Sequence, residues 1–310
     1  ISLFCDVPKS AIVQSENVDF IYEVPVKLQE QGLDEYVLYK LSLEGKPIVK
    51  NAWKEMIDSY RNVKDELEIG LVGKYVQLHD AYLSVSQALI DAGYKNAHKI
   101  NIRWINSEDV TEENTKELFN GLDGIIVPGG FGGRGIEGMI ATSKYARENN
   151  IPYFGICLGM QIAIIDIARN IANLNGADST EKDENAKHPV IDLMENQFDV
   201  ENIGGTLRLG NYDCKLLENS KARELYNSEV IQERHRHRYE FNNKYRKELE
   251  KAGVVFSGIN PELDLVEIIE FNGSDYFVAC QFHPEFKSRP NKVHPLFDGF
   301  IKASIKNKNK

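Results

Sequence analysis

A cysteine between two glycines is the first residue whose setting indicates chemistry. Cys157 lies in Gly-Ile-Cys-Leu-Gly, after the apolar run 151–156 and before apolar residues spaced as on a helix. This pattern predicts a strand, a sharp turn and a helix, with the thiol at the turn. The first amides of a helix favour negative charge, and the thiolate is the nucleophilic form of cysteine. We therefore treat Cys157 as a candidate nucleophile, although a lone cysteine in an apolar run is more often a small core residue.

A second motif offers the base that a thiol nucleophile needs. The apolar stretch 276–282 ends in His283-Pro-Glu285. Residues two apart on a strand face the same side, so Glu285 can orient the imidazole of His283. Alone, this motif is more typical of a surface histidine. Together with Cys157 it indicates a nucleophile, a base and an orienting carboxylate.

A glycine-rich segment follows the apolar run 124–127, at Pro128-Gly-Gly-Phe-Gly-Gly133. In open α/β sheets the ligand site lies beyond the carboxyl ends of the strands. We therefore expect this loop and Cys157 at the same edge of the sheet. By itself the loop would be read as a plain turn.

The elements that must position these residues alternate along the chain from Glu68. We expect an α/β fold with a mostly parallel central sheet and helices on both faces. Residues 178–205 are polar and expected to be irregular, and a smaller antiparallel C-terminal region and a frayed tail at 306–310 should follow. The expected strands are 69–75, 100–105, 124–127, 151–156, 206–209, 213–217, 254–259, 263–271 and 276–282, and the expected helices are 80–93, 111–121, one ending near 149, one after Cys157, 221–226, 242–252 and 295–305.

The first 65 residues differ from the rest. We expect a strand at 1–5, a helix between Pro25 and Gly32, an amphipathic helix around 53–60, and a charged linker at 61–68. These pieces are too scattered to bury a core. The sequence therefore predicts the end of another domain with a connection at 1–65 and a catalytic domain at 66–310. Because the chain begins with Ile1, we expect a piece of a longer protein.

Composition limits the class of protein. The net charge of −10 argues against nucleic-acid binding, and the 42% hydrophobic and 27% charged residues are typical of a soluble globular protein. No apolar run reaches membrane length, so no membrane partner is expected. Four widely spaced cysteines predict neither a metal site nor a disulfide framework, and favour a cytoplasmic location.

The cysteine and histidine motifs together resemble those of class I (triad) glutamine amidotransferases, which release ammonia from the glutamine side chain. The resemblance implies the flavodoxin-like fold of that class. It implies Cys157, His283 and Glu285 as the catalytic triad. Pro128-Gly-Gly-Phe-Gly resembles the oxyanion loop of these enzymes, so the amides of Gly130 and Leu158 are implied as the oxyanion hole.

Further motifs resemble CTP synthases in particular. The resemblance covers nearly the whole chain, and implies the glutaminase half of an enzyme that aminates UTP to CTP in pyrimidine biosynthesis. Gly133 departs from it, since relatives often carry a larger residue there. The motifs are 134–139, 175–181, 204–209, 233–242 and 282–286, with 1–5 and 19–25 resembling the end of the synthetase domain.

The same resemblance implies the ligands. Glu181 would bind the α-amino group of L-glutamine and Arg238 its α-carboxylate, a pairing that suits the forked guanidinium. GTP, an activator in the family, would bind near the oxyanion loop, with Phe131 and Arg236 as candidates. No cofactor is expected in this chain; Mg, ATP, UTP, GTP, the synthetase domain and a homotetramer are implied for the full-length enzyme. The full set of residues implied for glutamine binding is Gly130, Phe131, Leu158, Gly159, Met160, Gln161, Glu181 and Arg238.

Other functions stay open at this stage. The chain could be a glutaminase that serves another synthetase, such as those of GMP or carbamoyl phosphate. It could also be a non-catalytic scaffold that retains the fold for assembly. The basic run 234–238 alone would also fit a phosphate or nucleic-acid patch. The sequence contains no Gly-x-x-x-x-Gly-Lys-[Ser/Thr] phosphate loop for synthetase chemistry.

Overall fold

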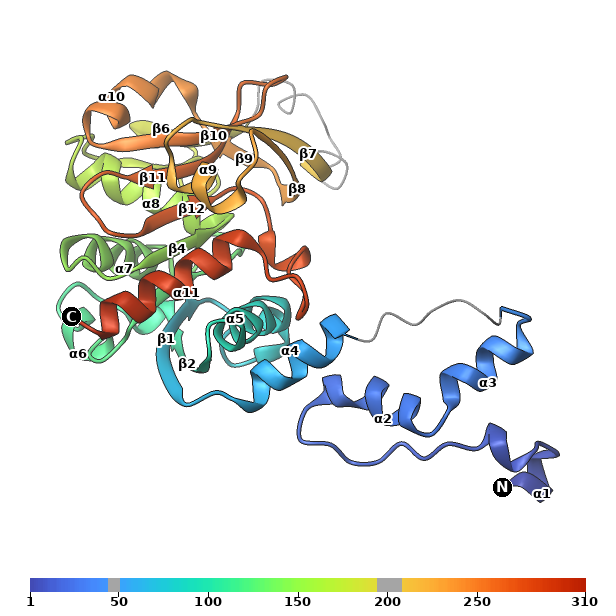
Figure 1. Cartoon of the computed structure of the whole chain (residues 1–310). Coiled ribbons are helices and arrows are strands. Elements are labelled where there is room, and N and C mark those ends of the chain that lie inside the picture. Colours follow the sequence, from blue (N-terminus) through green and yellow to red (C-terminus); the bar gives the residue numbers. More distant parts are fainter. Residues whose placement is uncertain (44–50, 194–207) are drawn as a thin grey trace. The chain divides into compact units, whose positions relative to one another are not determined.

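The computed structural model describes residues 1–43, 51–193 and 208–310. The chain divides into two compact units, residues 1–63 and 64–310. Figure 1 traces both units along the chain.

The first unit is helical and small. Tyr22 packs edge-on against Trp53 and Tyr60, with ring centroids 6.0 and 5.6 Å apart, and Trp53 Nε1 donates a 2.8 Å hydrogen bond to the Tyr22 carbonyl. The strand predicted at residues 1–5 is wrong: the segment forms a short helix, closed by the bond from Cys5 N to Ile1 O. The α-helices of this unit are α1 (Ser2–Cys5), α2 (Val24–Glu30), α3 (Leu33–Lys40) and α4 (Asn51–Arg61).

The second unit is built on a mixed sheet of nine strands in its described part. Five of them lie parallel, in the order β2-β1-β3-β4-β12. In register, Val127 of β3 lies beside Gly155 of β4, which lies beside Ala279 of β12. The loops after these strands therefore leave one edge of the sheet together. The parallel strands are β1 (Asp65–Gly73), β2 (His98–Asn106), β3 (Gly124–Val127), β4 (Tyr153–Ile156) and β12 (Phe277–Cys280).

Helices cover both faces of this sheet (Figure 1), because apolar side chains leave the strands on both sides. One core contains apolar residues of α5 (Leu83–Lys95), α9 (Lys221–Tyr226) and α11 (Pro295–Lys308). The other contains those of α7 (Ile136–Glu148) and α8 (Leu158–Asn170), with α6 (Thr115–Leu118) and α10 (Arg246–Lys251) at its margins. The α/β fold class predicted from the sequence is confirmed.

Antiparallel strands extend the sheet beyond β12. The order continues β11-β10-β7-β8, so the predicted antiparallel region is continuous with the parallel part. A separate three-stranded sheet has the order β5-β6-β9. These strands are β11 (Val266–Phe271), β10 (Val254–Ile259), β7 (Arg208–Leu216), β8 (Val230–His237), β5 (Ala177–Ser179), β6 (His188–Leu193) and β9 (Tyr239–Phe241).

Several local predictions are corrected. Strand β1 begins at Asp65, so the linker predicted at 61–68 is too long, and α11 continues to Lys308 instead of fraying at 306. Within the polar segment 178–205, β6 is regular because it pairs with β5 and β9. The parts of the predictions that concern 194–207, the irregular segment up to 205 and the start of the strand at 206–209, fall outside the described residues. Strand β8 was not predicted, because its alternating charged and buried residues lack the apolar pattern of a strand.

No helix in residues 1–43, 51–193 and 208–310 combines the length with the apolar character that crossing a lipid bilayer requires.

Candidate active site

Cys157 lies at a strained turn between β4 and α8. Its backbone has φ 52° and ψ −100°, a conformation that residues with side chains rarely adopt. The neighbouring glycines are required by close packing. A Cβ on Gly159 would lie 2.1 Å from the carbonyl oxygen of Val127, and one on Gly155 would lie 2.6 Å from that of Gly159. The glycine spacing around the thiol therefore reflects backbone contact as well as the turn itself.

His283 and Glu285 follow β12 at the same edge. His283 Nδ1 and Glu285 Oε1 are 2.7 Å apart, with both side chains mostly buried. The strand ends at Cys280, and a 3₁₀ turn at Pro284–Phe286 brings the two side chains together. The predicted pairing thus occurs, but through a turn and not through the two-residue period of a strand.

The imidazole of His283 lies beside Cys157. A Cβ on Gly129 would meet His283 Cε1 at 2.9 Å and Cys157 Cβ at 3.6 Å. His283 Nε2 is buried and has no hydrogen-bond partner among the described residues. This nitrogen is therefore free to give a proton to a reacting group or to take one from it. Burial by itself lowers the pKa of His283, but the neighbouring Cys157 thiolate and the bond to Glu285 raise it to about 11. The neighbouring groups therefore favour the protonated imidazole of His283.

A cavity of about 170 Å³ adjoins the thiol. It brings together Cys157 and five of the residues predicted to bind glutamine. Leu158, Gly159 and Met160 are buried at the start of α8 and do not line this cavity. The lining residues are Gly130, Phe131, Cys157, Gln161, Glu181, His237, Arg238 and Tyr239.

Two of these residues carry opposite charges. Glu181 follows β5 and accepts a 2.9 Å hydrogen bond from the backbone nitrogen of Gly132, so it also touches the glycine loop. Arg238 lies between β8 and β9, and its buried Nε has no hydrogen-bond partner among the described residues. An unpartnered guanidinium N–H beside a cavity is suited to an anionic group of a ligand.

A neighbouring cavity of about 350 Å³ shares Gly130, Phe131 and Cys157 with the first. Its wall also contains Arg236, and Phe131 is half-exposed between the two cavities. The loop 128–133 therefore separates a small charged cavity from a larger one with aromatic walls.

The basic run 234–238 does not form one continuous charged patch. On β8 the residues alternate, with His235 and His237 buried and Arg234 and Arg236 exposed. The buried histidines belong to a polar network in which His237 Nε2 lies 2.7 Å from Glu240 Oε1. Arg208 bonds to Glu267 at 2.6 Å, and burial raises the pKa of Glu267 against the opposing charge of Arg208. The two histidines of the run are therefore structural.

Two residues that contact the thiol or the glycine loop were not assigned from the sequence. The Nε2 atom of Gln281 lies 3.6 Å from Cys157 Sγ, and Lys74 at the end of β1 bonds to the glycine loop. The rule that sites gather at the carboxyl ends of parallel strands was the available signal, since both residues directly follow such strands.

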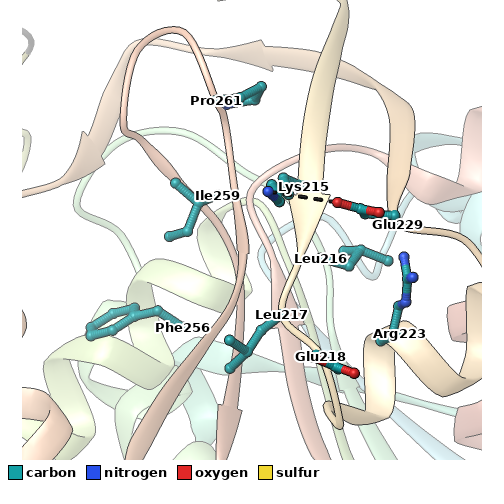
Figure 2. A pocket seen from close by; sticks show the side chains of 9 residues that line it. All are labelled: Lys215, Leu216, Leu217, Glu218, Arg223, Glu229, Phe256, Ile259 and Pro261. Atoms are coloured by element: carbon teal, nitrogen blue, oxygen red, sulfur yellow. Dashed lines mark ion pairs between the residues drawn. The ribbon is translucent and has the colours of Figure 1, made fainter.

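A third cavity, of about 500 Å³, is lined by a different set of residues, which Figure 2 shows. It is lined by parts of β7, α9 and β10, and contains none of the candidate site residues. Lys215 and Glu229 form an ion pair of 3.6 Å across its wall, as Figure 2 shows. Size alone therefore does not identify the reactive site.

The described side chains form no cluster of metal ligands. Across 1–43, 51–193 and 208–310, no group of three or more His, Cys, Asp or Glu residues is placed to hold a metal ion.

Comparison with known families gives two matches. Residues 77–303 match the family described as "Glutamine amidotransferase class-I", and residues 1–43 match "CTP synthase N-terminus". The first match covers both Cys157 and His283.

Curated relatives and a solved structure agree with these matches. The chain is 54% identical over 309 residues to a CTP synthase of Bacillus subtilis, covering 100% of this chain and 58% of the relative. It is 54% identical over 306 residues to a CTP synthase of Caldanaerobacter subterraneus, covering 98% of this chain and 57% of the relative. The solved glutaminase domain of Trypanosoma brucei CTPS with bound acivicin is 37% identical, with a TM-score of 0.73, 77% of this chain and 94% of that domain being covered.

Proposed function

The chain belongs to the class I glutamine amidotransferases of the CTP synthase family, and from this premise we propose that it hydrolyses glutamine to glutamate and ammonia. One observation carries the proposal. Cys157 stands at a strained turn, beside a buried His283–Glu285 pair, and opens into a cavity with one carboxylate and one guanidinium.

In the proposed reaction, the thiolate of Cys157 attacks the carboxamide carbon of glutamine. The amides of Gly130 and Leu158 stabilise the oxyanion of the tetrahedral intermediate. The imidazolium of His283 gives its proton to the leaving nitrogen, so ammonia departs and a thioester remains. His283 then takes a proton from water, the resulting hydroxide attacks the thioester, and glutamate and the thiolate are released.

Substrate recognition in this proposal depends on the two charged residues of the small cavity. Glu181 binds the α-ammonium group and Arg238 the α-carboxylate, which places the side-chain amide towards Cys157. Phe131 and Gln161 complete the binding site together with the oxyanion residues, whereas Gly159 and Met160 are buried at the start of α8 and do not line the cavity. The support is that Glu181, Arg238, Gln161 and Cys157 line one cavity.

The use of the ammonia is a wider proposal, because the chain spans about 58% of the length of the curated relatives it matches. We propose that ammonia aminates UTP to CTP in an ATP- and Mg-dependent reaction of the synthetase domain, in a cytoplasmic homotetramer. GTP would bind in the cavity of about 350 Å³ that adjoins Cys157, where Phe131 and Arg236 offer an aromatic surface and a cation. A thermal shift on adding GTP that is lost in Arg236→Ala would support this assignment.

The experiment that tests the function measures glutamate release by the purified chain and by its Cys157→Ala variant. Release by the first and not by the second supports hydrolysis at this thiol. No release by the wild-type chain would favour the non-catalytic scaffold. Formation of CTP after the synthetase half is supplied separates this function from service to another synthetase.

A further inference from the structure

Lys74 is a buried cation that the proposed chemistry does not use. It follows β1 at the same edge of the sheet as Cys157, and only 4% of its surface is exposed. A buried ammonium is costly unless its donors are satisfied. The groups that satisfy it therefore indicate what Lys74 does.

Its partners are two successive carbonyls of the glycine loop. Lys74 Nζ donates to Phe131 O at 3.0 Å and also to Gly132 O. The peptide unit that carries the Phe131 carbonyl also carries the amide of Gly132, which donates to Glu181 Oε1 at 2.9 Å. In a trans peptide the C=O and N–H point in opposite directions. This one peptide is therefore held between an ammonium and a carboxylate.

The stem of Lys74 supports the adjacent part of the loop. A Cβ on Gly130 would lie 3.5 Å from Lys74 Cδ, so the aliphatic chain packs under the proposed oxyanion donor. The backbone carbonyl of Lys74 accepts a 3.0 Å bond from Arg134, which is paired with Glu108 at 2.7 Å. Lys74 thus contacts the loop at Gly130 and at Phe131–Gly132, and it also contacts Arg134, the residue that follows the loop.

We propose that Lys74 is a positioning residue for glutamine hydrolysis: with Glu181 it fixes the Phe131–Gly132 peptide, and so holds the oxyanion loop in its working orientation. The inference rests on the proposed function. It also gives Glu181 a second role. The carboxylate assigned to the α-ammonium of glutamine is the same one that accepts the hydrogen bond from Gly132 N. Substrate binding and loop orientation are coupled through this side chain.

The surroundings of Lys74 change the pKa of its ammonium group. Burial lowers its pKa to about 8, with Arg134 acting in the same direction and Glu181 and Glu108 opposing it. The hydroxyl of Tyr82 accepts from the Lys74 backbone nitrogen and completes the polar groups around it. The hold on the loop is therefore strongest while the amine is protonated, because charge-assisted hydrogen bonds are the stronger ones.

The test compares Lys74→Met, which keeps the stem and removes the donors, with Lys74→Arg, which keeps a cation. The control is Lys99→Met on β2, where the lysine is exposed and pairs with Glu66 at 3.1 Å. Glutamate release gives kcat and KM. Alkylation of Cys157 by iodoacetamide reports on the thiol without forming an oxyanion, and peptide mass spectrometry separates it from alkylation of the exposed Cys5.

We expect Lys74→Met to lower kcat about 10- to 100-fold, somewhat less than the loss of an oxyanion donor, while KM changes less than about threefold. Cys157 should still be alkylated at the wild-type rate, Lys74→Arg should recover most of kcat, and Lys99→Met should behave as wild type. An unchanged kcat in Lys74→Met, or a parallel loss of alkylation, would overturn the inference. Absence of hydrolysis in the wild-type chain would instead overturn the proposed function.

If Lys74→Met does not fold, the pH dependence of kcat in the wild-type chain and in Lys74→Arg tests the inference. Between about pH 7 and pH 9.5 the wild-type kcat should fall about threefold more than that of Lys74→Arg, whose guanidinium stays charged. Identical pH profiles would contradict a role for the Lys74 ammonium.

Discussion

The side-chain amide nitrogen of Gln281 lies 3.6 Å from the sulfur of Cys157. Gln281 is fully buried, and its amide oxygen accepts a 3.3 Å bond from Gln161, which also donates to Tyr239 O at 3.0 Å. This chain of hydrogen bonds joins the cavity wall to the thiol. A hydrogen bond to a charged acceptor is stronger than one to a neutral acceptor, so the Gln281 amide is placed to contact the sulfur of Cys157 when it reacts as a thiolate.

Gln281→Leu should therefore slow both alkylation of Cys157 and glutamine hydrolysis, by about 10-fold, which corresponds to loss of one hydrogen bond to a charged group. Gln232→Leu, at an exposed position of β8, is the control. The measurement is the iodoacetamide rate at Cys157 together with kcat. Loss of hydrolysis with normal alkylation would show that Gln281 acts on the substrate and not on the sulfur.

Arg238→Ala should reduce kcat/KM for glutamine about 30- to 1,000-fold, because a charge-assisted contact to the α-carboxylate contributes roughly 2–4 kcal/mol. Arg103→Ala on β2 removes a half-exposed arginine 3.8 Å from Glu68, and should leave hydrolysis unchanged. Steady-state glutamate release measures both. An equal loss in the two variants would point to a general effect of arginine removal.

A diazo-ketone analogue of glutamine should label Cys157 and no other cysteine. Burial raises the pKa of both Cys214 and Cys280, which keeps these thiols protonated, and the exposed Cys5 lies outside the unit that holds the cavity. Peptide mass spectrometry of the treated chain locates the adduct, with Cys157→Ala as the control. Labelling at Cys214 or Cys280 would contradict the assignment of the nucleophile.

Asp166→Ala should lower the free energy of unfolding by about 3–5 kcal/mol, because it leaves the guanidinium of Arg147 buried without its partner. Asp166 is fully buried and accepts from Arg147 Nε at 3.1 Å and Nη2 at 3.0 Å. Glu148 pairs with the same guanidinium at 3.8 Å but is half-exposed, so Glu148→Ala should cost less than about 1 kcal/mol. Urea unfolding of both variants measures the difference, and equal costs would show that burial of the carboxylate is not decisive.

Much of the fold followed from the sequence. Alternating apolar runs and helical patterns from Glu68 predicted the parallel strands and their covering helices, because each element buries an apolar face at its own period. Strand β8 was missed because three of its buried residues, Glu233, His235 and His237, are polar, so the strand lacks an apolar face. Glu233 and His235 lie beside His294 and Glu267, which are distant in sequence.

The sequence by itself determined which residues could react: a thiol between glycines and a histidine two residues from a carboxylate are local patterns with chemical meaning. The tertiary structure decided the neighbours. Lys74 and Glu181 are more than 100 residues apart in sequence, yet they hold one peptide between them, because the ends of β1, β3 and β5 converge there. Contacts across such distances depend on the packing of the whole sheet, which no local pattern encodes.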